Sequence, residues 1–159
     1  MWGNAILSRY PIKQSGNVPL PPRDLLLKRG MLWANIDLGN GDELLFIATH
    51  YYHIDGGTAI RQVQSPELLR FWNQRPRTVI VGDMNAEPDS KEIIMLRDAG
   101  LTDAMAEFGQ ANTKTWPADK PLQRLDYIWL SPDLKPSNLL VPQSTASDHL
   151  GIAVTVEKK

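Results

Sequence analysis

The chain has 159 residues, a formal net charge of -1 and no cysteine. Without cysteine there is no disulfide framework, zinc-thiolate site or thiol nucleophile, so a bound metal must take oxygen or imidazole ligands. A net charge this close to zero provides no global attraction to nucleic acid, although it is compatible with a local basic patch. No apolar run approaches the roughly 18 residues that span a bilayer, and no basic-then-apolar leader is seen, so we expect a soluble chain of unknown compartment.

The first predicted elements are extended. Residues 4–8 show an apolar strand pattern with no preceding loop or cap, and we interpret this start as a truncated edge. Prolines at positions 11, 19, 21 and 22 predict a loop over the following segment. Strands over Met31–Leu38 and Leu44–Thr49 flank a turn of glycine, asparagine and aspartate, a pattern typical of a β-hairpin.

Two helical regions are predicted in the middle of the chain. The first opens at Gly56–Thr58, and Ser65-Pro66-Glu67 resembles the cap of a second helix with proline at its first position. The apolar stripe Leu68–Trp72 that follows is typical of core packing. Another helix, Lys91–Ala99, is expected to be capped by Asp89-Ser90 and closed by a left-handed Gly100.

Short apolar runs predict the remaining strands. Thr78–Val81 is rich in β-branched residues and lacks polar alternation, which predicts a strand buried on both faces. Further strands are expected over Leu125–Leu130, Asn138–Val141 and Gly151–Val156. Because there is no internal repeat, low-complexity tract or linker, residues 1–159 are expected to form a single α/β domain.

Polar side chains gather where these strands end. Asp83 and Asn85 follow the buried strand two residues apart, so strand alternation predicts that both face one cleft. Thr49-His50, Arg124–Ile128 and Ser147–His149 are expected to reach the same cleft. Carboxylate oxygens are hard ligands suited to Mg²⁺ or Mn²⁺, which makes Asp83 and Asp148 the predicted metal ligands.

The same segments offer the groups that phosphate ester hydrolysis requires. His149 directly follows Asp148, so a short turn would place an imidazole at the attacking water, and Asp126 is the carboxylate expected to orient it. His50 and the amide of Asn85 are candidates for binding the phosphoryl oxygens.

The cationic residues are weaker candidates. Arg9, Arg23, Lys28, Arg29 and Arg61 could line a substrate groove, and Arg61 is the one we retain as substrate-binding, although a solvated surface is the ordinary state of most. Arg124 is expected to pair structurally. His53 stands three residues after His50, but a zinc pair is disfavoured because the segment is a predicted loop without further imidazoles.

In this order the motifs resemble those of the endonuclease/exonuclease/phosphatase superfamily, the hydrolases related to pancreatic deoxyribonuclease. The likeness runs over essentially the whole chain and rests on Gly3–Pro11, Ala48–His50, Gly82–Asn85, Arg124–Ile128 and Ser147–His149. The resemblance implies an α/β (α+β) fold, the C-terminal part of a four-layer α/β/β/α sandwich with mostly antiparallel sheets.

The resemblance also implies roles for individual residues. Asp83 would position the attacking water, Asn85 would bind phosphate and His50 would assist the phosphoryl group. Asp126 would support His149, and Asp148 would help to hold the metal.

One departure from the family pattern affects the expected activity. Family members carry, upstream of the strand resembled by residues 4–8, an asparagine and a glutamine-glutamate motif whose glutamate is the principal metal ligand; the given sequence has no such segment. A sheet without its partner layer exposes an apolar face, so we expect an N-terminally truncated domain or a chain whose missing layer comes from its parent or a second subunit.

The resulting hypothesis is a Mg²⁺- or Mn²⁺-dependent phosphoesterase in which water attacks a metal-bound phosphoryl group of a phosphodiester or phosphomonoester. The alternative is a catalytically inactive interaction module or a fragment of such a domain, and the 159-residue chain alone is expected to be inactive or nearly so. Lipid headgroups, sugar phosphates and nucleic acid stay open as substrates, with a slight preference for a small molecule or lipid headgroup because few basic and aromatic groove residues can be assigned.

Overall fold

The computed structural model describes residues 3–24, 26, 28–54 and 56–159. Its strands are β1 (Ile12–Pro19), β2 (Gly30–Gly39), β3 (Asp42–His50), β4 (Thr78–Asp83), β5 (Thr102–Asp103), β6 (Asp126–Leu130), β7 (Leu134–Leu140) and β8 (Ala153–Lys158), and its helices are α1 (Thr58–Trp72), α2 (Lys91–Asp98) and α3 (Ala104–Glu107). The strands form a six-stranded sheet in the order β1-β2-β3-β4-β6-β5 and a two-stranded sheet of β7 and β8. Within the described residues β3 and β4 run parallel and the other neighbouring pairs run antiparallel, which confirms the predicted mixed α/β class.

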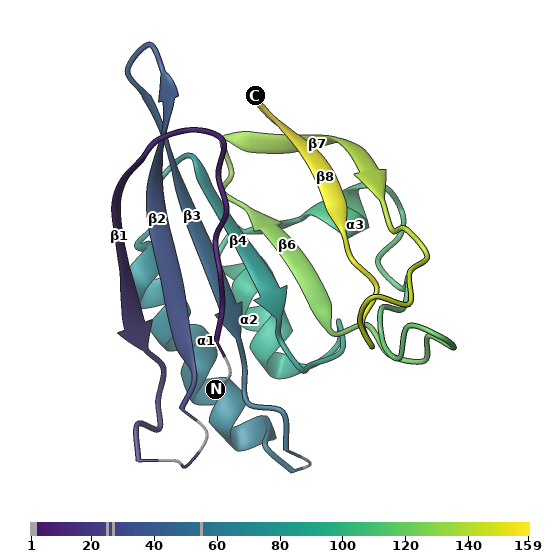
Figure 1. Cartoon of the computed structure of the whole chain (residues 1–159). Helices are drawn as coiled ribbons and strands as arrows, with labels where there is room; N and C mark the ends of the chain where they lie inside the picture. Colours follow the sequence, from purple (N-terminus) through teal and green to yellow (C-terminus); the bar gives the residue numbers. More distant parts are fainter. Residues whose placement is uncertain (1–2, 25, 27, 55) are drawn as a thin grey trace.

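The large sheet has a helix-covered face and an opposite face that meets the small sheet. Helices α1 and α2 lie behind the sheet in Figure 1, and Ile47, Ile80 and Trp129 pack against them in the main core. Residues one position away along the same strands, such as Val79 and Ile128, belong to a second cluster that includes Leu134 of β7. The period-two alternation of a strand therefore serves two hydrophobic layers, as expected for strands buried on both faces.

The predicted hairpin is confirmed, whereas the predicted break between two helices was wrong. Strands β2 and β3 pair antiparallel from Met31↔Thr49 to Asp37↔Glu43. Helix α1 runs without interruption through Pro66. The proline ring removes one backbone donor, which destabilises the helix, but Leu68 and Trp72, 0% and 1% exposed, anchor the helix in the core and offset that cost. Among the described residues, no helix has the length and apolar character needed to cross a bilayer.

The structure reverses the prediction for the start of the chain. Residues 4–8 pair with no strand among the described residues; instead the Asn4 amide donates to the carbonyls of Gly30 and Ala48, which holds the segment across the sheet. The expected loop contains β1, which pairs with β2 as an edge strand. Pro19 is its last residue, a place where a missing backbone donor costs little.

The short elements β5 and α3 were not predicted, because two and four residues are too few to show a period. Predicted strands 138–141 and 151–156 correspond to β7 and β8 with shifted ends. Helix α2 begins after Ser90, and Gly100 has the expected positive φ of 97°.

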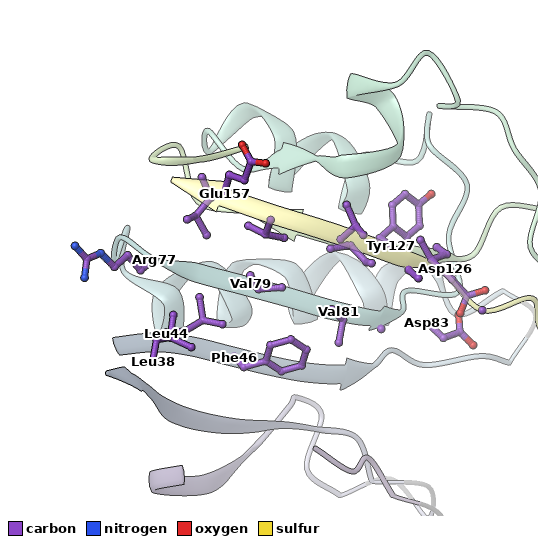
Figure 2. Close-up of a pocket in the computed structure, with 18 of the residues that line it drawn as sticks. Leu38, Leu44, Phe46, Arg77, Val79, Val81, Asp83, Asp126, Tyr127 and Glu157 are labelled. Atoms are coloured by element: carbon purple, nitrogen blue, oxygen red, sulfur yellow. The ribbon is translucent and has the colours of Figure 1, made fainter. Parts of the chain in front are cut away.

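A groove of about 780 Å³ runs between the face of the large sheet and β8. Figure 2 shows its apolar floor, with Phe46 and Val81 labelled, and places Asp83 and Asp126 together at one end and Arg77 at the other. The proposed site therefore lies at the mouth of an apolar groove.

Candidate active site

Strand register brings three of the predicted residues into a row. In the parallel ladder His50 is the partner of Asp83, and in the antiparallel ladder Asp83 is the partner of Asp126. Because register partners on adjacent strands point to the same face, the three side chains emerge side by side where β3 and β4 end and β6 begins.

A fourth residue, His149, joins this row from the loop that precedes β8. Its Nδ1 lies 2.8 Å from Asp126 Oδ2, and its Nε2 lies 3.9 Å from Asp83 Oδ2. On the other side, His50 Nε2 lies 3.4 Å from the same Asp83 oxygen. Segments separated by about a hundred residues therefore converge, as the motifs predicted.

The bond to Asp126 fixes the imidazole of His149. Since a carboxylate only accepts, Nδ1 carries the proton and Nε2 is directed to Asp83. Burial alone would lower the pKa of His149, but the hydrogen bond to Asp126 and the charges of Asp126 and Asp83 outweigh it, so the pKa lies above its ordinary value. This is the geometry of an imidazole that is oriented by a carboxylate, with its second ring nitrogen unshared.

Burial and the nearby charge of Asp126 raise the pKa of Asp83 to about 6, against the lowering effect of the hydrogen bond from the Asn85 backbone. Asp83, Asp126 and His149 each offer a ligand atom, and these atoms lie within 4.8 Å of one another. Two close carboxylates in a half-buried site repel each other, and a divalent cation relieves that repulsion. The donor set therefore fits Mg²⁺ or Mn²⁺.

His50 behaves differently from His149. Burial lowers its pKa to about 4, and the positive charge of Arg29 acts in the same direction, as do His53 and His149 whenever they are protonated. The ring is therefore neutral at physiological pH and can donate a single hydrogen bond to an oxyanion.

Asn85 reaches the site by a route that strand alternation did not predict. β4 ends at Asp83, and Asn85 has a positive φ of 47° beyond the strand. Its backbone nitrogen donates to Asp83 Oδ1 at 2.8 Å, and its Nδ2 donates to the Tyr51 carbonyl at 3.1 Å. A side chain-to-backbone turn, rather than a shared strand face, holds the two residues together.

Two predicted site residues lie outside this cluster. Asp148 is exposed, its carboxylate accepts a hydrogen bond from the Ser147 hydroxyl, and it is not among the clustered ligand atoms. Arg61 donates from Nε to Glu92 Oε1 at 2.8 Å and from Nη1 to the Tyr52 carbonyl at 3.2 Å, so these two bonds tie it to structural partners. The roles assigned to Asp148 in metal binding and to Arg61 in substrate binding stay predictions.

Other residues near the site carried weaker sequence signals. The Trp116 ring lies 6.4 Å from the His149 ring, centroid to centroid, and nothing in its local sequence distinguishes it from core tryptophans. Arg29, one of several groove candidates, places Nη2 2.9 Å from His53 Nδ1. Arg124 is buried and pairs with Asp103 at 2.6 Å, the structural role that was expected.

The chain is similar in sequence or in fold to several known proteins. The uncharacterized protein YbhP of Escherichia coli K12 is 27% identical over 164 residues, covering 97% of this chain and 62% of YbhP. The human Nocturnin catalytic domain with bound sulfate superposes with a TM-score of 0.77 at 24% identity, covering 95% of this chain and 61% of Nocturnin. Danio rerio TDP2 complexed with a single-strand DNA product gives a TM-score of 0.72 at 19% identity, covering 94% and 69% of the two chains.

The chain thus spans about three fifths of the length of YbhP and of the Nocturnin domain. The two structural likenesses show the fold. Residues 1–149 match the Endonuclease/Exonuclease/phosphatase family, which covers most of the sequence and ends at His149. The chain therefore belongs to the endonuclease/exonuclease/phosphatase family.

Proposed function

We propose that this chain carries the catalytic cluster of a divalent-metal-dependent phosphoesterase in which water attacks the phosphorus of a phosphate ester. The observation that supports the proposal most directly is the convergence of Asp83, Asp126 and His149 within 4.8 Å, with His50 beside Asp83. Two acids and two imidazoles at the end of one groove match what hydrolysis of a phosphoryl group needs.

Asp83 and Asp126 supply the carboxylate oxygens that would hold Mg²⁺, with Asp148 as a further predicted ligand. When bound, Mg²⁺ polarises the phosphoryl oxygens and offsets the negative charge that develops on them. The unshared Nε2 of His149 and the carboxylate of Asp83 hold the attacking water between them, and one of these groups takes its proton. Asp126 stabilises the imidazolium if His149 is the acceptor.

The phosphoryl oxygens meet donors from the other side of the row. Neutral His50 donates from a ring nitrogen, and the Asn85 amide, oriented by the Tyr51 carbonyl, has a second N–H for the same purpose. The guanidinium of Arg29 adds a positive charge near His50 and Asp83. As the ester bond breaks, the leaving oxygen departs with the bonding electrons and is protonated from the water network.

We also propose that a further layer of protein structure covers the apolar groove. The groove between the sheets is lined by apolar side chains such as Phe46, Val81 and Val154, and soluble proteins rarely leave so large an apolar surface uncovered. We propose that a segment of the parent chain, or a second subunit, fills it and supplies the glutamate that the family resemblance implies. Full activity therefore requires that layer.

The decisive experiment uses the full-length parent protein. Hydrolysis of plasmid DNA, sphingomyelin, phosphoinositides and a bis-aryl phosphodiester is measured with Mg²⁺, with EDTA and after Mg²⁺ is restored. We expect EDTA to abolish turnover of at least one substrate and Mg²⁺ to restore it. Turnover that is unaffected by EDTA would refute the metal dependence.

The same panel of substrates identifies the substrate class. Nocturnin binds sulfate and TDP2 a single-strand DNA product, which is consistent with a site for phosphate-like anions and leaves lipid, sugar and nucleic acid esters open. If every substrate fails and the parent sequence lacks an upstream glutamate, the alternative of an inactive interaction module holds.

A further inference from the structure

Two loops beside the active site are joined by a hydrogen bond between side chains. Arg29 lies at the end of the loop between β1 and β2, and His53 lies on the loop between β3 and α1. Arg29 Nη2 and His53 Nδ1 are 2.9 Å apart. Because a guanidinium has donors and no acceptor, His53 Nδ1 must accept, which places the ring proton on Nε2.

The two loops are also joined beneath this contact by Gln64 of α1, which is 1% exposed. Its Oε1 accepts from the Tyr52 nitrogen at 3.0 Å, and its Nε2 donates to the Pro21 carbonyl at 3.0 Å. The base of both loops is therefore fixed by a buried amide, and the Leu20 backbone nitrogen donates to the Arg29 carbonyl at 2.8 Å. Because the backbone of Arg29 is anchored in this way, the contact with His53 acts on its side chain.

Arg29 lies next to the end of β3 that carries the catalytic row, because it directly precedes Gly30 of β2 and Met31 pairs with Thr49, the residue before His50. Its positive charge lowers the pKa of both Asp83 and His50. An arginine side chain has several rotatable bonds and loses rotamer freedom when it is held in one place, so an acceptor that fixes the guanidinium preorganises the anion site.

We propose that His53 is a positioning residue that holds the Arg29 guanidinium toward the phosphoryl group of the substrate. The inference deepens the proposed function and rests on it, since it assigns Arg29 to the phosphate-binding side of the site. His53 contacts Arg29 and is not one of the clustered ligand residues Asp83, Asp126 and His149.

The test compares three variants of the full-length parent protein. His53→Asn keeps an acceptor near the position of Nδ1, His53→Leu removes it at similar size, and Arg29→Gln removes the cation. The first readout is rotation of the Arg29 Nη groups by NMR, which needs no activity. We expect slow rotation in the wild type and His53→Asn, and fast rotation in His53→Leu.

The second readout is binding of inorganic phosphate in the presence of Mg²⁺. We expect His53→Leu to weaken binding about three- to tenfold, the range for losing the net contribution of one ordinary hydrogen bond, and His53→Asn to bind like the wild type. In the Arg29→Gln background, His53→Leu should have no further effect. In the full-length parent the same variants should raise KM more than they change kcat.

Two results would overturn the assignment: unchanged Arg29 rotation in His53→Leu, or an equal loss of phosphate binding whether or not Arg29 is present. Because His53 is exposed, unfolding of the variant is not expected, and equal thermal midpoints check this. If the wild type binds no phosphate, the proposed function fails, and the NMR readout by itself then supports or overturns the hold of His53 on Arg29.

Discussion

Replacing Asp83 with asparagine is expected to stabilise the fold at neutral pH while removing a group that the proposed chemistry needs. The carboxylate is 14% exposed and lies beside Asp126, so its charged form is disfavoured in the folded chain. Asparagine keeps the acceptor for the Asn85 backbone nitrogen, which donates to Asp83 Oδ1. The substitution therefore removes the charge and preserves the turn.

The magnitude follows from the pKa. Folding raises the pKa of Asp83 from 3.8 to about 6, a shift of roughly two units. At 1.36 kcal/mol per unit this is about 3 kcal/mol, or about 6–12 °C in Tm for a chain of this length. Since the folded pKa is raised, the contribution of Asp83 to stability is present below its unfolded pKa and is lost as pH rises through the folded value.

The assay is thermal unfolding of the wild type and Asp83→Asn between about pH 4 and pH 8 in EDTA. We expect the two midpoints to meet at the acidic end and the variant to lead at the basic end. Asp148→Asn is the control, because it removes the same charge from an exposed carboxylate and should change stability by less than about 0.5 kcal/mol. A variant that is no more stable at pH 8, or a gap that does not close near pH 4, would refute the reasoning.

Three further predictions follow from the site and the core. His149→Ala in the full-length parent should lower kcat about 10²–10⁴-fold in a phosphodiester assay. The wild-type pKa of His149 is raised above 6.5, so the wild-type rate should rise with pH and reach half of its maximum at a pH above 6.5. Arg124→Leu should cost about 3–5 kcal/mol in urea unfolding, since the guanidinium is fully buried and its ion-pair partner would be left unpaired; a loss below about 1 kcal/mol would contradict this. Gly82→Ala should yield little soluble protein, because its Cβ would lie 2.0 Å from the Thr49 oxygen, whereas Gly151→Ala meets nothing within 4 Å and should express normally.

The sequence predicted the positions of the candidate site residues best where these residues lie at the ends of strands. His50 and Asp83 each end an apolar strand and Asp126 begins one, and the register of the three strands then aligns them. An apolar strand gives a strong local signal in the sequence. The ends of these strands could therefore be located, and the order of the motifs predicted that the residues at those ends would lie together.

What escaped prediction depends on contacts between distant segments. The partner of Arg61 is Glu92, a fully buried acid 31 positions away, and no local pattern distinguishes that pair from a surface pair. Asp148 lies on the loop between β7 and β8, and the path of that loop, which local sequence does not determine, leaves its side chain exposed. The strand pattern of residues 4–8 is genuine in composition, but a strand needs a neighbour, and the segment pairs with none among the described residues.

Backbone ladders align His50, Asp83 and Asp126, so the sheet fixes the distances between these side chains and the surrounding loops do not have to. Ladder spacing is common to every sheet, so the distances between reactive groups cannot drift unless pairing itself is lost. The surrounding loops, among them those that carry Arg29 and His53, are free to vary in length and composition without disturbing those distances. Under the proposed function, a centre held by the ladders would keep its geometry while changes in the loops alter which ester it selects.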